Sequence, residues 1–382
     1  MHEDIEMNKK DIAQIRRRLN PESQNPVVIC GCYVNGQKNV VSAFRRSLIS
    51  LPQSESEKYM QIFRRSLSGD VGRNLVPLTF PTDEVMDGAT HARLTRLNQT
   101  ALDDDEALNA FFDAIIAGTR IEGNFLILVL HDTYDVPFKT SMDDEAAGAE
   151  SETVFSYVLC AVCPVKQTKP CLSYSASEND FHALDPDWVV ASPDMGFLFP
   201  AFEDGGPNIH SALFYTRDLA ESHDDFVAAA LNAGAFAPAA EQKETFKTVL
   251  REALEDECSF EVVEAVNEHI VSRLEEQKQD KEAEPARIGK REVEKVLTDL
   301  GVSPERTQSF SERFDEEFGL GNDLPAAGIA DDKQMELRTG EVTIRVSPGC
   351  AGLVETRTID GVKYILIRAD EGVCVNGVNV DI

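Results

Sequence analysis

A histidine and two aspartates follow one apolar segment of the chain at a spacing that could do chemistry. The segment runs from Asn124 to Leu130, and the polar residues are His131, Asp132 and Asp135. Imidazole nitrogens and carboxylate oxygens bind divalent metal ions and activate water. Polar residues directly after a buried strand lie at a sheet edge, where open α/β sheets place their ligand crevices. These three are therefore the candidate catalytic residues.

Neighbouring predicted strands could complete a divalent metal site. The residues with suitable donor atoms there are Asp194, Glu203, Asp204 and His210. The candidate metal ligands are His131, Asp135, Asp194 and His210. The alternative interpretation is structural, because Asp135-Val136-Pro137 is also typical of a turn. The short pattern is compatible with both interpretations.

Cysteines form another candidate metal set. Cys160-x-x-Cys163, Cys171 and Cys30-x-Cys32 could supply thiolates to zinc. The residues between the first pair continue a predicted strand, however, and positions i and i+3 of a strand face opposite sides of the sheet. Buried cysteines are also common as small hydrophobic residues. We expect free thiols, in keeping with a reducing compartment.

Positive charge is concentrated near the start of the chain. The formal net charge of the 382 residues is -30, yet residues 1–100 hold 14 Lys and Arg against 11 Asp and Glu. A helix expected after Asn8 carries, opposite its apolar residues, Lys9, Lys10, Arg16, Arg17 and Arg18. The pentapeptide Phe-Arg-Arg-Ser-Leu occurs at residues 44–48 and 63–67. These arginines could face a polyanion, although Arg64 and Arg65 also suit the C-terminal end of a helix dipole.

The composition limits the class of protein. A chain with 42% hydrophobic residues can bury the cores of two or three domains. Neither an apolar run of about 18 residues nor a signal-peptide pattern is found in the sequence, so we expect a cytoplasmic protein without a membrane segment. It also lacks a glycine-rich phosphate loop, a Gly-x-Ser-x-Gly elbow and a dinucleotide fingerprint. The commoner enzyme classes are thus unsupported.

Local signals predict where several helices begin. Asn8 is a candidate N-cap, and Ser54-x-x-Glu57 has the pattern of a capping box. The three aspartates at residues 103–105 favour a helix start because they complement its dipole. Ser303 is a further candidate N-cap, with proline at the next position.

Strand and turn signals alternate with these helices. Residues 27–34 and 40–48 are rich in β-forming residues, and Asn35-Gly36 between them predicts a hairpin. The continuous apolar run at residues 124–130 indicates a strand buried on both faces. Asp360-Gly361 predicts another hairpin near the end of the chain. The expected fold is α+β, with a mixed-sheet domain over 1–235, an acidic helical segment over 241–320 and a small β module over 337–382.

Several stretches of the sequence resemble a bacterial family known as domain of unknown function 4317. They begin at Met7-Asn8-Lys9-Lys10, Gly31-Cys32-Tyr33-Val34, His131-Asp132-Thr133-Tyr134, Cys160-Ala161-Val162-Cys163, Pro193-Asp194-Met195-Gly196, Val354-Glu355-Thr356-Arg357 and Ala369-Asp370-Glu371-Gly372. The resemblance spans most of the chain and implies no activity, cofactor or partner. The order of an early strand-helix unit, a middle strand and a second unit near Trp188 is also similar to bacterial proteins related to archaeal and eukaryotic release factors.

Two functional hypotheses follow from the sequence. The first is a cytoplasmic binding or regulatory protein that contacts a protein or ribonucleoprotein partner through residues 1–70. The charge asymmetry and the missing catalytic motifs favour it. The alternative is a metal-dependent hydrolase centred on His131, Asp132 and Asp135. The sequence leaves open whether the protein is an enzyme, which reaction or substrate it would serve, and its oligomeric state.

Overall fold

The chain forms two compact units in the computed structural model. The first comprises Met1–Glu241 with Asp280–Pro285, and the second comprises Gln242–Gln279 with Ala286–Ile382. Both combine helices with antiparallel strand pairs, so the predicted α+β class is confirmed. The structure describes residues 7–20, 27–135, 154–203, 206–234, 236–280, 283–331, 335–347, 350–369, 372–375 and 378–380.

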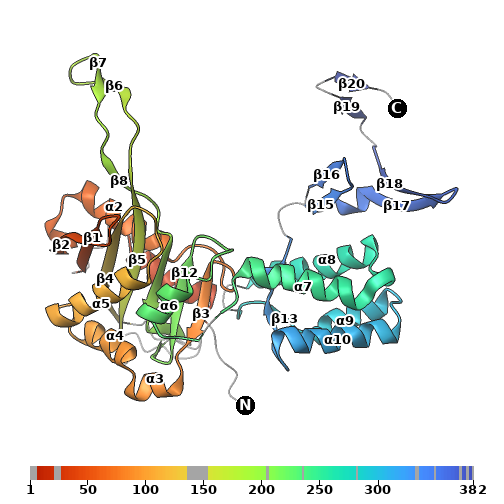
Figure 1. Ribbon diagram of the computed structural model, residues 1–382, viewed down its shortest axis with the longest axis horizontal. Coiled ribbons are helices and arrows are strands. Elements are labelled where there is room, and N and C mark those ends of the chain that lie inside the picture. The colour runs from red at the N-terminus through yellow and green to blue at the C-terminus, as the bar shows by residue number, and fades with distance from the viewer. Residues whose placement is uncertain are drawn as a thin grey trace, which may run out of the picture. The chain divides into compact units, whose positions relative to one another are not determined.

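An antiparallel sheet is the centre of the first unit (Figure 1). Its strand order is β2-β1-β4-β5-β9-β12-β3, and β8 pairs with the end of β5. The strands are β1 (Val28–Val34), β2 (Val40–Ser47), β3 (Leu75–Thr79), β4 (Asn124–Asp135), β5 (Val154–Gln167), β8 (Trp188–Val190), β9 (Met195–Phe199) and β12 (Ser211–Thr216). The hairpin predicted from Asn35-Gly36 is confirmed, because β1 and β2 pair on either side of it.

Helices cover both faces of this sheet. One face packs against α1 (Lys9–Arg18) and α2 (Gln53–Arg65), which is preceded by the short helix η1 (Leu48–Ser50). The other face packs against α3 (Thr82–Asp87), α4 (Ala89–Gln99), α5 (Asp105–Gly118) and α6 (Asp224–Ala230). Two smaller strand pairs complete the unit, β6 (Cys171–Ser175) with β7 (Asp180–Leu184) and β10 (Ala201–Glu203) with β11 (Gly206–Asn208).

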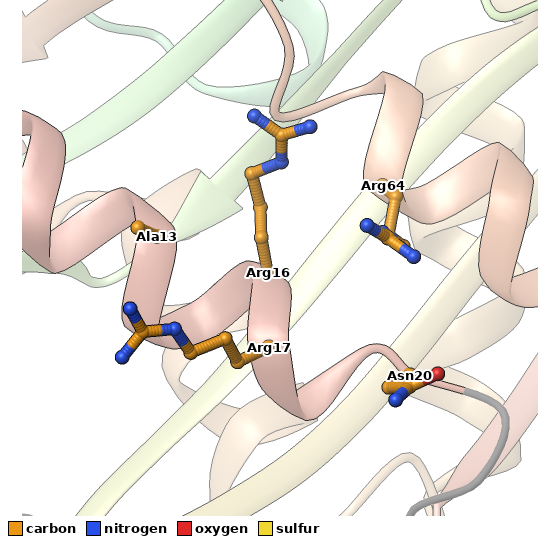
Figure 2. Close-up of a pocket in the computed structure, with 5 residues that line it drawn as sticks. All are labelled: Ala13, Arg16, Arg17, Asn20 and Arg64. Atoms are coloured by element: carbon orange, nitrogen blue, oxygen red, sulfur yellow. The ribbon is translucent and has the colours of Figure 1, made fainter.

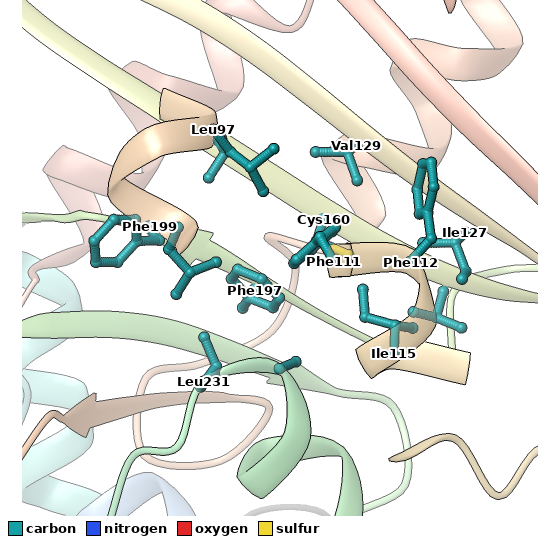
Figure 3. Packing of buried hydrophobic residues seen from close by; sticks show 14 of the residues in the cluster. Leu97, Phe111, Phe112, Ile115, Ile127, Val129, Cys160, Phe197, Phe199 and Leu231 are labelled. Atoms are coloured by element: carbon teal, nitrogen blue, oxygen red, sulfur yellow. The ribbon is translucent and has the colours of Figure 1, made fainter. Parts of the chain in front are cut away.

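Alternation along the central strands divides the core into two layers. Ile127 and Val129 of β4 face the α4–α5 side, whereas Leu126, Leu128 and Leu130 face the α1–α2 side. Figure 3 shows the first layer, in which aromatic and aliphatic side chains of α5 meet those of β4, β5 and β9. Each large apolar side chain buried here contributes about 1.5–3 kcal/mol. The predicted burial of the 124–130 strand on both faces is thus confirmed.

Of the helix starts predicted in the first unit, two agree with the structure and one differs. The Asn8 Oδ1 accepts hydrogen bonds from the backbone N–H groups of Lys10 and Asp11 at 2.9 and 3.0 Å. Asp104 caps α5 in the same way. The capping box predicted at Ser54 is wrong: Pro52 occupies the N-cap position and α2 begins at Gln53, so Ser54 lies inside the first turn.

The second unit begins with helices around a separate apolar core. They are α7 (Ala239–Leu254), η2 (Glu255–Glu257), α8 (Phe260–Gln279), α9 (Lys290–Asp299), α10 (Pro304–Phe318) and α11 (Ala326–Ile329), with β13 (Arg287–Ile288) paired to β14 (Leu324–Pro325). Ser303 is the N-cap residue of α10, as predicted. Its hydroxyl donates to the Glu257 carboxylate at 2.8 Å instead of capping the helix.

Hairpins make up the rest of the second unit. The strands are β15 (Met335–Arg338), β16 (Thr343–Val346), β17 (Val354–Ile359), β18 (Val362–Ile367), β19 (Val373–Val375) and β20 (Val378–Val380), with η3 (Ala351–Leu353) before β17. Asp360 and Gly361 have φ angles of 52° and 81°, and they join β17 to β18 as predicted. Among the described helices, none combines the length and the apolar composition that a membrane crossing requires.

Candidate functional site

Asp132 lies within β4, and its carboxylate anchors helix α1 to the sheet. The Arg18 guanidinium donates to it twice, from Nε to Oδ2 at 2.7 Å and from Nη2 to Oδ1 at 2.9 Å. The Tyr157 hydroxyl donates to Oδ2 at 3.0 Å, and the Thr133 N–H donates to Oδ1 at 2.9 Å. The hydrogen bond with Asp132 raises the pKa of Arg18. Protein donors therefore occupy both carboxylate oxygens, as expected of a buried ion pair.

His131 belongs to a different polar network on the opposite face of the sheet. Its Nε2 lies 3.0 Å from the Ser156 hydroxyl, which itself donates to the side chain of Asn98 on α4. The Asn98 amide also donates to the Ser156 carbonyl at 2.9 Å. Burial lowers the pKa of His131, so the ring is neutral at pH 7. Neighbouring residues of a strand face opposite sides, so His131 and Asp132 do not share a site.

The strand itself explains why these residues do not stand at an open edge. The prediction placed them directly after β4, but the ladder with β5 continues from Asn124↔Val165 to Asp135↔Val154. His131 also pairs with Val28 of β1. The two residues are thus inside the sheet. The side chain of Asp135 lies outside the described residues, as does Asp204.

The other predicted metal ligands lie far from His131. Asp194 precedes Met195, which pairs with Val162 of β5, whereas His131 pairs with Val158. Asp194 is thus displaced from His131 by five residues along the strand direction, which is about 16 Å at roughly 3.3 Å per residue. An ion pair joins Asp194 to Arg217 at 2.5 Å, and burial raises the pKa of this aspartate. His210 is exposed and directly precedes β12. Because β12 is three strands from β4 in the sheet, His210 is about 14 Å from the strand of His131, at roughly 4.8 Å per strand.

Glu203 also has structural partners. Its Oε1 accepts a hydrogen bond from the Ser211 hydroxyl at 2.8 Å. Within the described part of the chain, no three Cys, His, Asp or Glu side chains are grouped closely enough to hold a metal ion. Among the described side chains, His131 and Asp132 are therefore not joined by the further ligands that the metal-dependent hydrolase hypothesis needs.

The cysteines are separated by the same alternation. Cys160 lies in the core layer facing α4 and α5, whereas Cys163 lies in the layer facing α1 and α2. Cys30 and Cys32 are also buried and free. Burial raises the pKa of Cys163 to about 12 and that of Cys32 to about 11. Both are protonated thiols at neutral pH and serve as small apolar core residues.

An arginine-lined pocket lies on the α1–α2 side of the first unit. Its volume is ≈ 360 Å³, and it is lined by Ala13, Arg16, Arg17, Asn20 and Arg64. In Figure 2, Arg16 extends upward from α1 and Arg17 extends to the left of it, while Arg64 extends downward from α2 on the right. None of the three arginines forms a hydrogen bond or ion pair with a described residue. The described residues of the lining thus concentrate positive charge and include no carboxylate.

Three neighbouring basic residues differ from these arginines in having partners. Arg18 is bound to Asp132, Lys9 lies 2.9 Å from Asp70, and Arg65 donates to Ser192 at 2.7 Å. Among the described residues, the guanidinium groups of the pocket are therefore available to a ligand.

A family model described as "Domain of unknown function (DUF4317)" matches residues 7–378, nearly the whole chain. The chain belongs to this family. The resemblance seen in the sequence is thereby confirmed. No curated protein matches the chain, and no solved structure matches it. The site in this DUF4317 chain must therefore be interpreted from its own residues.

Sequence reasoning found part of this site and missed part. The basic face of α1 and the pair Arg64-Arg65 were visible from helical spacing. The sequence did not reveal that Arg18 points inward, because its partner Asp132 is 114 residues away along the chain. Tyr157 was also missed, since the β4–β5 register that places it opposite Asp132 has no local signal. Of the three consecutive arginines in this DUF4317 chain, Arg18 thus holds α1 to the sheet, whereas Arg16 and Arg17 are available to a ligand.

Proposed function

We propose that this protein is a cytoplasmic binding protein that contacts the phosphates of a ribonucleoprotein partner through the face formed by α1 and α2. The observation that carries the proposal is the pocket of Arg16, Arg17 and Arg64, whose guanidinium groups have no partner among the described residues. Guanidinium forks match phosphate oxygens in shape and charge, and they bind them through two parallel hydrogen bonds.

Helix α1 is fixed in place before any ligand binds. Ile12, Ile15 and Leu19 are buried in the core, and Arg18 is held by Asp132 and lies 5.0 Å over the ring of Tyr134. The positions of Arg16 and Arg17 on the outer side of the helix are therefore set by the fold. Preorganised cations lose less freedom on binding, which favours affinity.

The charge of the whole chain supports a localised contact. The 282 residues after residue 100 hold 23 Lys and Arg against 56 Asp and Glu, so most of the surface repels a polyanion. Arginines from two helices can contact successive phosphates of one strand, as in proteins that bind single-stranded nucleic acid. A strand of RNA is the simplest ligand that satisfies both conditions.

Fluorescence anisotropy with a labelled 20-nucleotide single-stranded RNA tests this proposal. The full chain and the triple variant Arg16→Ala/Arg17→Ala/Arg64→Ala are titrated at several salt concentrations. Loss of three phosphate contacts should weaken binding and reduce the slope of log K against log salt by about two to three. The three side chains are partly or fully exposed, so the variant should fold normally.

Arg291→Ala provides a matched control, because Arg291 is an exposed arginine on α9 in the other unit. It should leave affinity and salt slope unchanged. The proposal fails if the wild-type chain does not bind the RNA. It also fails if the triple variant binds as tightly as wild type, or if the control loses as much affinity.

A further inference from the structure

A two-stranded ribbon extends from the sheet of the first unit. Strands β6 and β7 pair antiparallel from Cys171↔Leu184 to Ser175↔Asp180. In Figure 1 the ribbon projects beyond the strands to which it is connected, at the end of β5 and β8. No strand pair is predicted here from the sequence. None of its residues lines the arginine-lined pocket, and the ribbon is not used in the function proposed above.

The ribbon is amphipathic. Leu172 lies opposite Ala183 and Tyr174 lies opposite Phe181, so these four side chains share one face. The tilted rings of Tyr174 and Phe181 have centroids 5.2 Å apart. Ser173 and His182 form a pair on the other face. The strand alternation therefore separates an apolar face from a polar one.

The apolar face is uncovered. The relative exposure is 73% for Leu172, 50% for Tyr174 and 65% for Phe181. Contiguous exposed apolar patches on soluble proteins mark interaction sites, and a lone two-stranded ribbon is at best marginally stable in water. A partner that covers this face would remove its apolar side chains from water and would also stabilise the ribbon.

Charge indicates which kind of partner fits. Residues 170–187 contain no Lys or Arg, and their carboxylates are Glu178, Asp180, Asp185 and Asp187. An acidic ribbon on a chain of net charge -30 repels RNA, an anionic membrane surface and a second copy of the chain. It attracts a cationic protein surface.

We propose that the apolar face of the β6–β7 ribbon docks into an apolar groove rimmed by Lys and Arg on a basic protein. Leu172, Tyr174 and Phe181 enter the groove, and Glu178 and Asp180 near the tip meet its basic rim. Aromatic side chains in a desolvated groove dominate the binding energy, while the charges set orientation and association rate.

Site-specific photo-crosslinking of the full chain in cells that naturally contain it tests the proposal. Benzoylphenylalanine is placed at position 181 on the apolar face and at position 182 on the polar face. Crosslinked proteins and peptides are identified by mass spectrometry. Position 181 should give one main adduct, in a protein with isoelectric point above about 9 and in a peptide with apolar residues between Lys or Arg. Position 182 should give little.

Binding of the identified protein in purified form completes the test. Tyr174→Ser/Phe181→Ser should weaken it at least about tenfold, as expected for a central aromatic pair. Glu178→Lys/Asp180→Lys should weaken it and reduce its salt dependence. Ser173→Ala, on the polar face, is the control that should bind as wild type.

Several results would overturn the proposal. They are adducts to a second copy of the chain, to lipid, to RNA or to an acidic protein, equal yields at positions 181 and 182, and the absence of any adduct. Unchanged affinity of both double variants would overturn it as well. RNA binding at the arginine-lined pocket should persist in the ribbon variants, so the two proposals can fail separately.

Discussion

At the scale of single residues, His131 and Asp132 have structural partners on opposite faces of one strand. Asp132 holds Arg18 and Tyr157, and His131 meets Ser156. Each is a buried polar group that is hydrogen-bonded to a neighbouring side chain. Buried polar groups of this kind become costly when a partner is removed.

Replacing Asp132 should destabilise the first unit strongly. In Asp132→Ala, Arg18 and Tyr157 lose their acceptor while they remain partly or fully buried. We expect the free energy of unfolding to fall by about 2–3 kcal/mol, less than for a fully buried pair because Arg18 keeps some contact with water. Urea denaturation measures this. Asp103→Ala is the control: this carboxylate is paired with Arg45 but is 82% exposed, so its loss should cost less than about 1 kcal/mol. Equal losses would contradict the expectation.

Stability should depend on pH through His131. Burial lowers its pKa in the folded state, so between that lowered value and the ordinary 6.5 the unfolded chain binds more protons than the folded one. The free energy of unfolding should therefore decrease as the pH falls through and below 6.5. His131→Gln should show a smaller decrease between pH 7.5 and 5.5, measured by urea titration. His182→Gln, at an exposed position, should follow the wild type. If the free energy of unfolding of the wild type falls no more steeply with decreasing pH than that of His131→Gln, His131 does not cause the pH dependence.

At the scale of elements, close pairing of β5 and β9 depends on a residue without a side chain. A Cβ added at Gly196 would lie 2.3 Å from the backbone oxygen of Cys160 on β5. Real atoms do not approach so closely, and a backbone atom between two buried strands has little room to move. The position therefore requires glycine for reasons of space.

Gly196→Ala should separate the two strands locally. We expect a loss of about 1–3 kcal/mol or more in the free energy of unfolding, typical of overpacked cores. Thermal unfolding followed by circular dichroism measures the change. Gly206→Ala serves as control, because the nearest atom to its added Cβ is 4.0 Å away. If both variants melt together with wild type, the steric argument is incorrect.

At the scale of the whole molecule, most helices and hairpins whose signals lie in neighbouring residues could be predicted from the sequence. Helix α5 with its Asp104 cap and the hairpin at Asp360-Gly361 follow from neighbouring residues alone. The β6–β7 ribbon and the capping position of Pro52 were missed because their signals are weak or compete with stronger ones. The predicted ligands His131, Asp194 and His210 lie apart in the sheet for a different reason. Spacing along a chain does not determine strand register, and register decides which distant residues meet.

The two-sided burial of β4 has a consequence for folding fidelity. Both faces of β4 are apolar, so hydrophobic burial alone would tolerate a shift of its pairing register by one residue. Such a shift exchanges Leu128 and Val129 between the two core layers. The same slip would turn His131 and Asp132 toward the wrong faces. Each would then lose its partner, which would leave an unpaired carboxylate buried on one face of the sheet and an unpaired imidazole on the other. These two polar residues inside the strand therefore make the correct register more stable than one shifted by a residue.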